Sequence, residues 1–402
     1  MAWLVPREDL TNVQLRAVGL NTRGHKVILG GPGSGKTLVL LHRARYLLDE
    51  MRIDESRFRI FVFTKVLKQY IVSALGDLDL PDKCTINFDA WCLNFYKNNI
   101  STNVPWIDKM PDFKAIRNNI YEFICNKNNF QPIYDFVMVD EGQDLNDVAY
   151  GILTRISKHI TVCMDNNQQL YNSGSSESKV FEYLGITMKS ASLLEAYRCS
   201  PYIIKLAASM LPEDKQSAFE SQSRTRTTDI QTPLLYYAQD WQEEQKHLIE
   251  VAKTRIMRND SLAVLLPKNR MIYGYARAFK DAGIEVETSN NLNFANDKPK
   301  ILTYHGAKGL TFDSVLMPRL VNYSFRMFND DEIRRQIFVG ITRAQNWVYL
   351  STVENQRTPI LERVLHLEAN RMLTLQKHGQ TNVLNVNTVQ QAADENDYFF
   401  DF

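Results

Sequence analysis

The stretch of sequence that decides the fold is KVILGGPGSGKTLVLLHRARYLLDE, residues 26–50. Residues 26–29 are mainly apolar and predict a buried strand, and from Lys36 to Glu50 apolar side chains recur at helical spacing. The turn between them, residues 30–37, matches GxxxxGK followed by Thr, with a strand before it and a helix after it as this motif requires. We therefore expect a phosphate-binding loop between a strand of a parallel sheet and its covering helix.

The residues of this loop have the properties that phosphate binding needs. Glycines permit positive φ and a close approach of backbone N–H groups to phosphate oxygens at a helix N-terminus. We expect Gly33, Ser34 and Gly35 to form this cradle, Lys36 to reach the β- and γ-phosphates, and the Thr37 hydroxyl to bind Mg²⁺. The alternative is an incidental glycine-rich turn, which the strand and helix on its two sides argue against.

A second motif, VMVDEGQD at residues 137–144, places two carboxylates at the end of an apolar strand. We expect Asp140 to hold Mg²⁺, directly or through water, and Glu141 to orient and deprotonate the attacking water. A solvated acidic turn after a strand is the competing interpretation. The phosphate-binding loop upstream favours the catalytic one.

The rest of the chain predicts an α/β fold. Short apolar strands alternate with helical patterns, which is typical of parallel sheets covered on both faces. We expect two domains, residues 1–186 and 187–358, each a mainly parallel sheet flanked by helices. The first would carry a small helical insertion at about residues 93–131, which lacks strand patterns. Residues 359–402 would form a C-terminal helix and an acidic, aromatic tail.

Composition restricts the class of protein further. A chain of 402 residues predicts two or three domains. Since 47 Lys and Arg residues balance 46 Asp and Glu residues, no globally basic surface is expected, and nucleic acid would need a local groove. The five cysteines show no CxxC spacing, which indicates reduced thiols. No signal peptide or membrane span is expected, so we predict a cytoplasmic protein without a membrane partner.

With the acidic motif, the sequence resembles the UvrD/Rep branch of superfamily 1 helicases. Residues 140–144 match the DExQD box of that family, and the other family motifs occur along the chain in the family order. The resemblance covers about Thr11 to Ser351. It implies two RecA-like domains with ATP and Mg²⁺ in the cleft between them. The other matching stretches are LTNVQ at 10–14, FTK at 63–65, MDNNQQLY at 164–171, AYRC at 196–199, TYHGAKGLTF at 303–312 and VGITRA at 339–344.

The resemblance assigns further residues to the nucleotide site. Gln14 would read the adenine edge, Tyr197 would stack on the adenine, and Gln168 would sense the γ-phosphate and link it to the DNA groove. Arg198 and Arg343 would contact the γ-phosphate from the opposite domain, so that closure of the cleft stabilises the transition state. A surface ion pair is the ordinary alternative for each arginine.

Other matching residues are assigned by the resemblance to DNA or to the edge of the nucleotide site. Thr64 and Lys65 would contact DNA phosphates in the first domain, and Tyr171 lies in the box that joins nucleotide to DNA. His305 would help to couple the two ligands, or would be an ordinary histidine at a helix start. Gly309 would lie at the bound nucleotide.

The sequence also departs from the family pattern. Residues 172–174, Asn-Ser-Gly, stand where relatives carry Trp-Arg-Gly with a base-stacking aromatic, so that stacking residue is missing or supplied elsewhere in the chain. Leu38 replaces an adenine-packing Arg, and Thr311 replaces a ribose-binding Glu, which predicts looser nucleotide selectivity. The span from Arg198 to Ile301 is too short for the usual large insertion of the second domain, so the chain resembles a compact member.

The function expected is that of an ATP-dependent translocase or helicase on single-stranded DNA, moving 3′ to 5′ if the family polarity holds. The alternative is a DNA-stimulated ATPase switch, or a regulatory motor subunit of a nuclease complex, that does not unwind alone. A non-catalytic scaffold is disfavoured because the nucleotide motifs are complete. Asp394–Phe402 combines acids with aromatics and would fold back on the second domain, dock to a partner, for instance a nuclease, or stay disordered.

Overall fold

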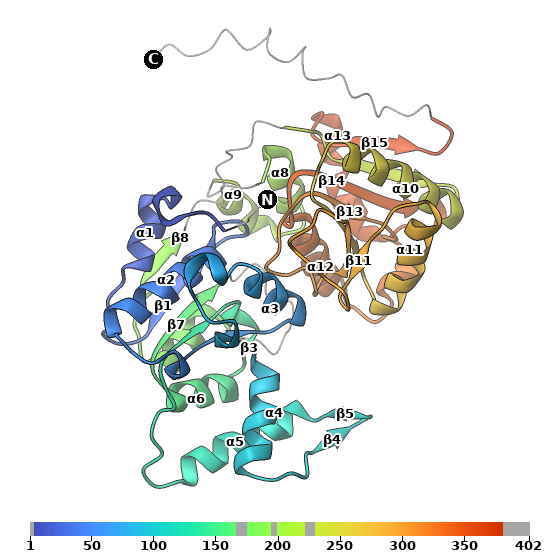
Figure 1. Cartoon of the computed structure of the whole chain (residues 1–402). Coiled ribbons are helices and arrows are strands. Elements are labelled where there is room, and N and C mark those ends of the chain that lie inside the picture. Colours follow the sequence, from blue (N-terminus) through green and yellow to red (C-terminus); the bar gives the residue numbers. More distant parts are fainter. Residues whose placement is uncertain (1–3, 166–174, 194–198, 222–229, 381–402) are drawn as a thin grey trace, which may run out of the picture.

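The computed structural model describes residues 4–165, 175–193, 199–221 and 230–380. Two mainly parallel sheets, each flanked by helices, lie side by side in the molecule (Figure 1). This arrangement confirms the expected α/β fold class with two RecA-like domains. Among the described residues, no helix combines the length and apolar character needed to cross a membrane.

The first sheet has the strand order β3-β2-β6-β7-β1-β8, with neighbouring strands parallel. Its central strands are largely apolar because a parallel sheet is buried on both faces. Side chains alternate between two core clusters, with Ile28 in one and Val27 in the other. The strands are β1 Lys26–Gly30, β2 Phe58–Val62, β3 Thr85–Asn87, β6 Tyr134–Val139, β7 Ser157–Met164 and β8 Ala191–Leu193.

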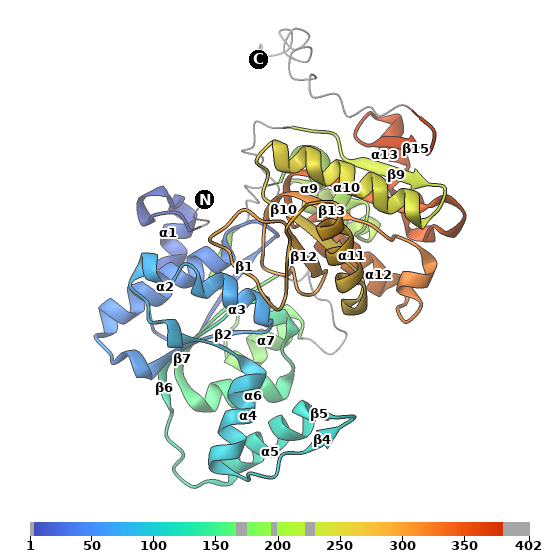
Figure 2. The same ribbon diagram turned by 45° about the vertical axis from the view of Figure 1, so that its right-hand side comes forward.

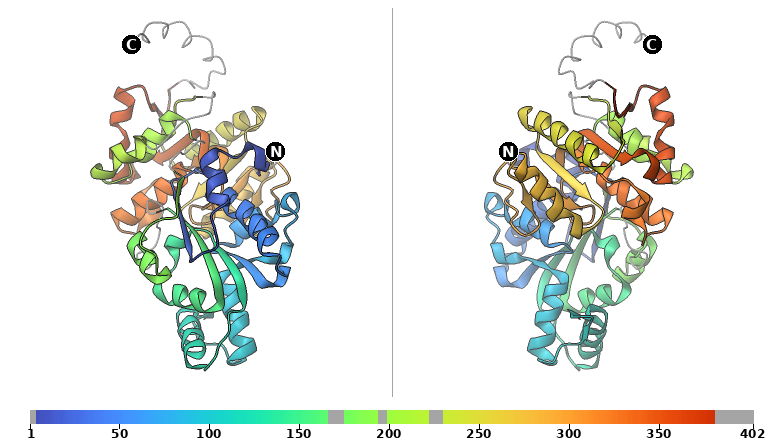
Figure 3. Two further views of the ribbon diagram at one scale, coloured as in Figure 1. Left: turned by 90° about the vertical axis from the view of Figure 1, so that its left-hand side faces the viewer. Right: turned by 90° about the vertical axis from the view of Figure 1, so that its right-hand side faces the viewer.

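Helices cover both faces of this sheet, and two of them extend away from it as the insertion. In the views of Figure 3, α4 and α5 lie at the end of the molecule away from the second sheet. An antiparallel hairpin of β4, Trp106–Ile107, and β5, Met110–Pro111, joins them. The helices are α1 Asn12–Val18, α2 Lys36–Met51, α3 Lys65–Val72, α4 Phe88–Asn99, α5 Phe113–Asn126, α6 Asp147–Ile156 and α7 Glu177–Leu184.

The second sheet has the order β11-β12-β10-β13-β14-β9-β15, again with parallel neighbours. Its strands are β9 Leu234–Ala238, β10 Leu262–Leu266, β11 Glu287–Thr288, β12 Lys300–Thr303, β13 Phe312–Met317, β14 Ala344–Val353 and β15 Thr374–Lys377. Its helices are α8 Pro201–Ala208, α9 Glu213–Ser221, α10 Trp241–Met257, α11 Asn269–Asp281, α12 Asp330–Ile341 and α13 His366–Ala369.

Two strands lie outside the domain limits that the sequence suggested. β8 comes after residue 186, yet it pairs with β1 in the first sheet. β15 comes after residue 358, yet it pairs with β9 in the second sheet, and the expected C-terminal helix is reduced to the short α13 and a 3₁₀ helix at Pro359–Val364. The domain limits themselves stay a prediction.

The two domains contact each other through α3, which faces the second domain in Figures 1 and 2. The Tyr70 ring packs edge-on against Phe294 of the second domain, with ring centroids 5.0 Å apart. A Cβ atom on Gly309 would lie 2.7 Å from Leu67 of α3, so glycine permits the close approach. This contact brings the TYHGAKGLTF stretch beside the acidic motif of the first domain.

Candidate nucleotide site

The phosphate-binding loop runs from the end of β1 to the start of α2. Gly33 and Gly35 have φ of 71° and 84°, a left-handed conformation that glycine adopts without strain. A Cβ atom on Gly35 would lie 2.6 Å from Gln14 Nε2. The loop therefore depends on glycine here, and it leads into the N-terminus of a 16-residue helix whose dipole attracts anions.

The groups in this loop fit the phosphates of a nucleotide. The Ser34 hydroxyl is buried and has no hydrogen-bond partner within the described part of the chain. Lys36 Nζ donates to the carbonyl oxygens of Gly30 and Gly31, at 2.9 Å each, and lies 3.7 Å from Asp165 Oδ2. A buried donor, an ammonium group and a helix N-terminus thus lie in one cradle, as expected for an anion site.

Thr37 and Asp140 meet at the start of α2 and the end of β6, where the Thr37 hydroxyl donates to Asp140 Oδ2 at 2.7 Å. Burial, and then the charge of Glu141, raise the pKa of Asp140 to about 6. A buried carboxylate beside a hydroxyl provides the hard oxygen ligands that Mg²⁺ prefers. The residues therefore fit the metal that the sequence predicted, and its charge would favour the ionised form of Asp140.

Glu141 follows Asp140 in a left-handed conformation, with φ of 54°. Gln143 Nε2 donates to Glu141 Oε2 at 2.6 Å, and Lys308 Nζ lies 3.5 Å from the same oxygen. Burial opposes the charge, but Lys308 above all, then Lys36 and Arg343, hold the pKa of Glu141 below its ordinary value. The carboxylate is thus oriented and ionised, as a group that accepts a proton from water must be.

Lys308 comes from the second domain and was not assigned a role from the sequence. Its Nζ lies 2.7 Å from Asp144 Oδ2, and the residue is 1% exposed. Burial disfavours its charge, yet Glu141 and Asp144 raise the pKa of Lys308 above its ordinary value. This buried ion pair joins the two domains at the candidate base. Its position in the TYHGAKGLTF stretch was the available sequence signal.

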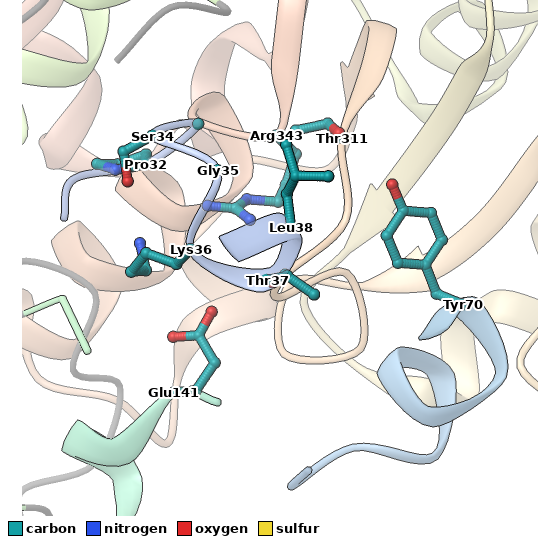
Figure 4. Close-up of a pocket in the computed structure, with 12 residues that line it drawn as sticks. Pro32, Ser34, Gly35, Lys36, Thr37, Leu38, Tyr70, Glu141, Thr311 and Arg343 are labelled. Atoms are coloured by element: carbon teal, nitrogen blue, oxygen red, sulfur yellow. The ribbon is translucent and has the colours of Figure 1, made fainter. Parts of the chain in front are cut away.

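Arg343 reaches the same pocket from the loop after α12. Its guanidinium donates to the carbonyl oxygens of Val339 and Leu310, at 3.0 and 3.1 Å, and to the Thr342 hydroxyl at 3.1 Å. These bonds fix a side chain that is 3% exposed. Figure 4 shows its guanidinium pointing toward the loop at Gly35. The pocket is lined by the residues Pro32, Gly33, Ser34, Gly35, Lys36, Thr37, Leu38, Tyr70, Glu141, Gly309, Thr311 and Arg343.

Gln14 anchors α1 to the phosphate-binding loop. Its Nε2 donates to the Ser34 carbonyl at 3.2 Å, and its Oε1 accepts from the Thr11 backbone N–H at 3.0 Å. Gln14 thereby completes a capping box at the start of α1. Its expected contact with adenine stays a prediction.

Thr64, Lys65 and His305, the described residues among those expected to bind DNA, do not line this pocket. The Thr64 hydroxyl caps α3 by accepting from the Leu67 N–H at 3.0 Å, and Lys65 is exposed on the first turn of the same helix. His305 is half-buried, and burial followed by Lys308 lowers its pKa. Their contact with DNA stays a prediction. Gln168, Tyr171, Tyr197 and Arg198 lie outside the described residues.

Comparison with known families agrees with this geometry. The model of the UvrD/REP helicase N-terminal domain matches residues 10–102, and that of the UvrD-like helicase C-terminal domain matches residues 290–355. The first match contains the phosphate-binding loop, and the second contains Lys308 and Arg343. The two matches therefore fall on the two sides of the pocket.

Similar proteins that carry a name are named as DNA helicases. A Mycoplasma pneumoniae protein named "Probable DNA helicase" is 22% identical, over 86% of this chain and 84% of its own. YjcD of Bacillus subtilis, whose name describes an ATP-dependent DNA helicase, is 23% identical over 67% of this chain and 48% of its own. The protein named "ATP-dependent DNA helicase srs2" of Schizosaccharomyces pombe is 20% identical, over 64% of this chain and 31% of its own. With both family domains matched and the motifs around one pocket, the chain belongs to the UvrD/Rep-like family of helicases.

Proposed function

We propose that this protein is an ATP-driven motor that moves 3′ to 5′ along single-stranded DNA and separates duplex strands ahead of it. One observation carries the proposal: Lys36, Thr37 and Glu141 from the first domain share a pocket with Arg343 from the second. A site divided between two domains is completed only when they close, which ties hydrolysis to domain movement.

The residues of the pocket have separable tasks in this scheme. Lys36 and the N–H groups of the loop hold the phosphates, and Glu141 accepts the proton of the attacking water. Arg343 stabilises the negative charge that develops on the transferred group. Mg²⁺, held by Thr37 and Asp140, would supply charge neutralisation at the phosphates. Phosphate release would then loosen the contacts across the pocket, and the domains would separate.

The test is ATPase activity with and without single-stranded DNA, followed by strand displacement on duplexes with a 3′ or a 5′ single-stranded tail. We expect DNA to stimulate the ATPase, and displacement only on the 3′-tailed duplex. Displacement only on the 5′-tailed duplex would contradict the proposed polarity. DNA-stimulated hydrolysis without displacement would favour the second candidate, a switch or motor subunit of a nuclease complex.

Nucleotide selectivity is expected to be loose. Leu38 and Thr311 both line the pocket, where the sequence pattern of relatives places Arg and Glu. We expect ATP to be preferred to GTP by a modest factor. We also expect dATP to be used well, since neither side chain carries a charge that could bind a ribose hydroxyl. Turnover measured with ATP, dATP and GTP checks this. Thr311→Glu should lower dATP use, and rejection of dATP by the unaltered protein would contradict the prediction.

Removing the ammonium of Lys308 is expected to weaken the contact between the domains. Lys308→Met would remove the buried ammonium group that pairs with Asp144 and Glu141, and breaking a buried ion pair costs about 3–5 kcal/mol. We expect a lower melting temperature and weaker nucleotide binding. Adding Asp144→Asn should recover part of the loss, whereas strictly additive losses would show that the two side chains do not act as a pair.

A protein partner is a further proposal from the sequence. Asp394–Phe402 lies outside the described residues, so its docking to a nuclease or another protein stays a prediction. Co-purification with and without this segment tests it, with the melting temperature as the control for folding.

A further inference from the structure

A group of aromatic and basic side chains at the surface of the second domain does not line the nucleotide pocket. We define it as the tyrosine platform, made of Lys268, Arg270, Tyr273 and Tyr323. The two tyrosines are 67% and 57% exposed, respectively. Large aromatic side chains so accessible to solvent are more typical of binding surfaces than of a protein interior.

Cations flank the Tyr323 ring. Lys268 Nζ and Arg270 Cζ each lie 5.8 Å from its centroid, within the range of cation–π interactions. Arg270 also lies 3.5 Å from the Tyr323 hydroxyl, measured from its Nη2. The ring thus lies beside two positive charges while the residue stays 57% exposed.

The neighbouring face of α11 continues this pattern. Arg270, Tyr273 and Arg277 follow one another at helical spacing and therefore lie on the same face of α11. Gly274, between them, has open space where a Cβ atom would lie. Asn290 Nδ2 donates to the Tyr273 hydroxyl at 3.2 Å and so fixes the second ring from one side. The surface therefore alternates cations and aromatic rings.

The topology places the platform on the same edge of the sheet as His305. β12, β10 and β13 are adjacent and parallel, so their carboxyl ends share one edge. His305 follows β12, Lys268 follows β10 and Tyr323 follows β13. Ligands of open parallel sheets bind at this edge.

We propose that the tyrosine platform binds single-stranded DNA, with a base stacked on Tyr323 and neighbouring phosphates at Lys268 and Arg270. Aromatic rings beside cations are the chemistry by which proteins hold single strands without reading their sequence. This inference rests on the proposed function. It also provides a stacking residue in a chain whose residues 172–174 lack the one found in relatives.

The experiment measures the affinity of the full chain for a fluorescent oligothymidylate and for an abasic oligonucleotide of the same length. We expect Tyr323→Ala to weaken oligothymidylate binding by about five-fold to a hundred-fold. The abasic strand should be bound with nearly unchanged affinity, because it has no base to stack. Tyr323→Phe keeps the ring and should bind like the unaltered protein.

The control is Trp241→Ala. Trp241 is 54% exposed, comparable to Tyr323, and stands at the start of α10, next to its acidic N-cap residue Asp240. The Trp241→Ala substitution should leave the affinities for oligothymidylate and for the abasic strand unchanged. Melting temperatures of all variants check the fold.

Three outcomes separate this inference from the proposed function. If the unaltered protein binds no single strand and its ATPase ignores DNA, the proposed function fails. If it binds but Tyr323→Ala changes nothing, only the platform is wrong. If Tyr323→Ala lost affinity for both oligonucleotides equally, the inference would also be overturned. Such a result would indicate an altered fold or charge instead of lost stacking.

Discussion

Replacing Glu141 by Gln is expected to abolish nearly all ATP turnover while ATP still binds. The substitution keeps the shape of the side chain and its contact with Gln143, but it removes the carboxylate that we propose accepts a proton from water. Loss of a general base lowers turnover by about 10²–10⁴-fold. Single-turnover hydrolysis measures the chemical step, and equilibrium binding of a fluorescent ATP analogue measures affinity.

Two companion variants make this result specific. Lys36→Ala should weaken binding as well as turnover, because the ammonium group holds phosphate in the ground state and in the transition state alike. Glu250→Gln, at an exposed position of α10, should change neither quantity. Near-normal hydrolysis by Glu141→Gln would show that another group activates the water.

Replacing Arg343 by Ala is expected to lower kcat by roughly 10³-fold, the scale on which arginines act in phosphoryl transfer. KM should change far less, because the guanidinium acts mainly on charge that develops in the transition state. Its bonds to the carbonyl oxygens of Val339 and Leu310 hold it on the second domain, so its contact with the phosphate depends on closure of the pocket. Steady-state kinetics with saturating DNA measure both parameters.

Folding must be checked for this variant. Truncation removes the guanidinium donor from the Leu310 carbonyl and one of two donors from the Val339 carbonyl, which also accepts from the Thr342 hydroxyl, and such a loss costs about 1–3 kcal/mol of stability. Arg343→Lys keeps the charge and loses the fork of donors, so it should recover only part of kcat. An effect on KM alone, in a variant with an intact melting transition, would mean that Arg343 binds ground-state nucleotide and does not act in the chemical step.

Much of the fold was predictable because its signals are local. The strands Tyr134–Val139 and Leu262–Leu266 match mainly apolar runs in the sequence, since a parallel strand buried on both faces is largely apolar. The short edge strand β8 and the late strand β15 carry weak patterns, and only their pairing with β1 and β9 identifies them. The periodicity of apolar residues within one segment does not show which distant strand that segment pairs with.

For the site, the sequence by itself predicted which residues would carry the chemistry. The glycine-rich loop with Lys36 and Thr37, and the acidic pair Asp140 and Glu141, follow from spacing and residue type. The resemblance added Arg343. These assignments come from motifs that tolerate few alternatives, since positive φ, metal ligation and proton transfer each demand particular side chains.

Only the tertiary structure decided how the two halves of the site meet. It placed Lys308 of the second domain 2.7 Å from Asp144 and 3.5 Å from Glu141, a pairing that no spacing could reveal. It also gathered Lys268, Arg270 and Tyr323 at one edge of the second sheet. The physical reason is that Coulomb and stacking energies depend on distance in space, and the packing of α3 and the order of parallel strands set those distances.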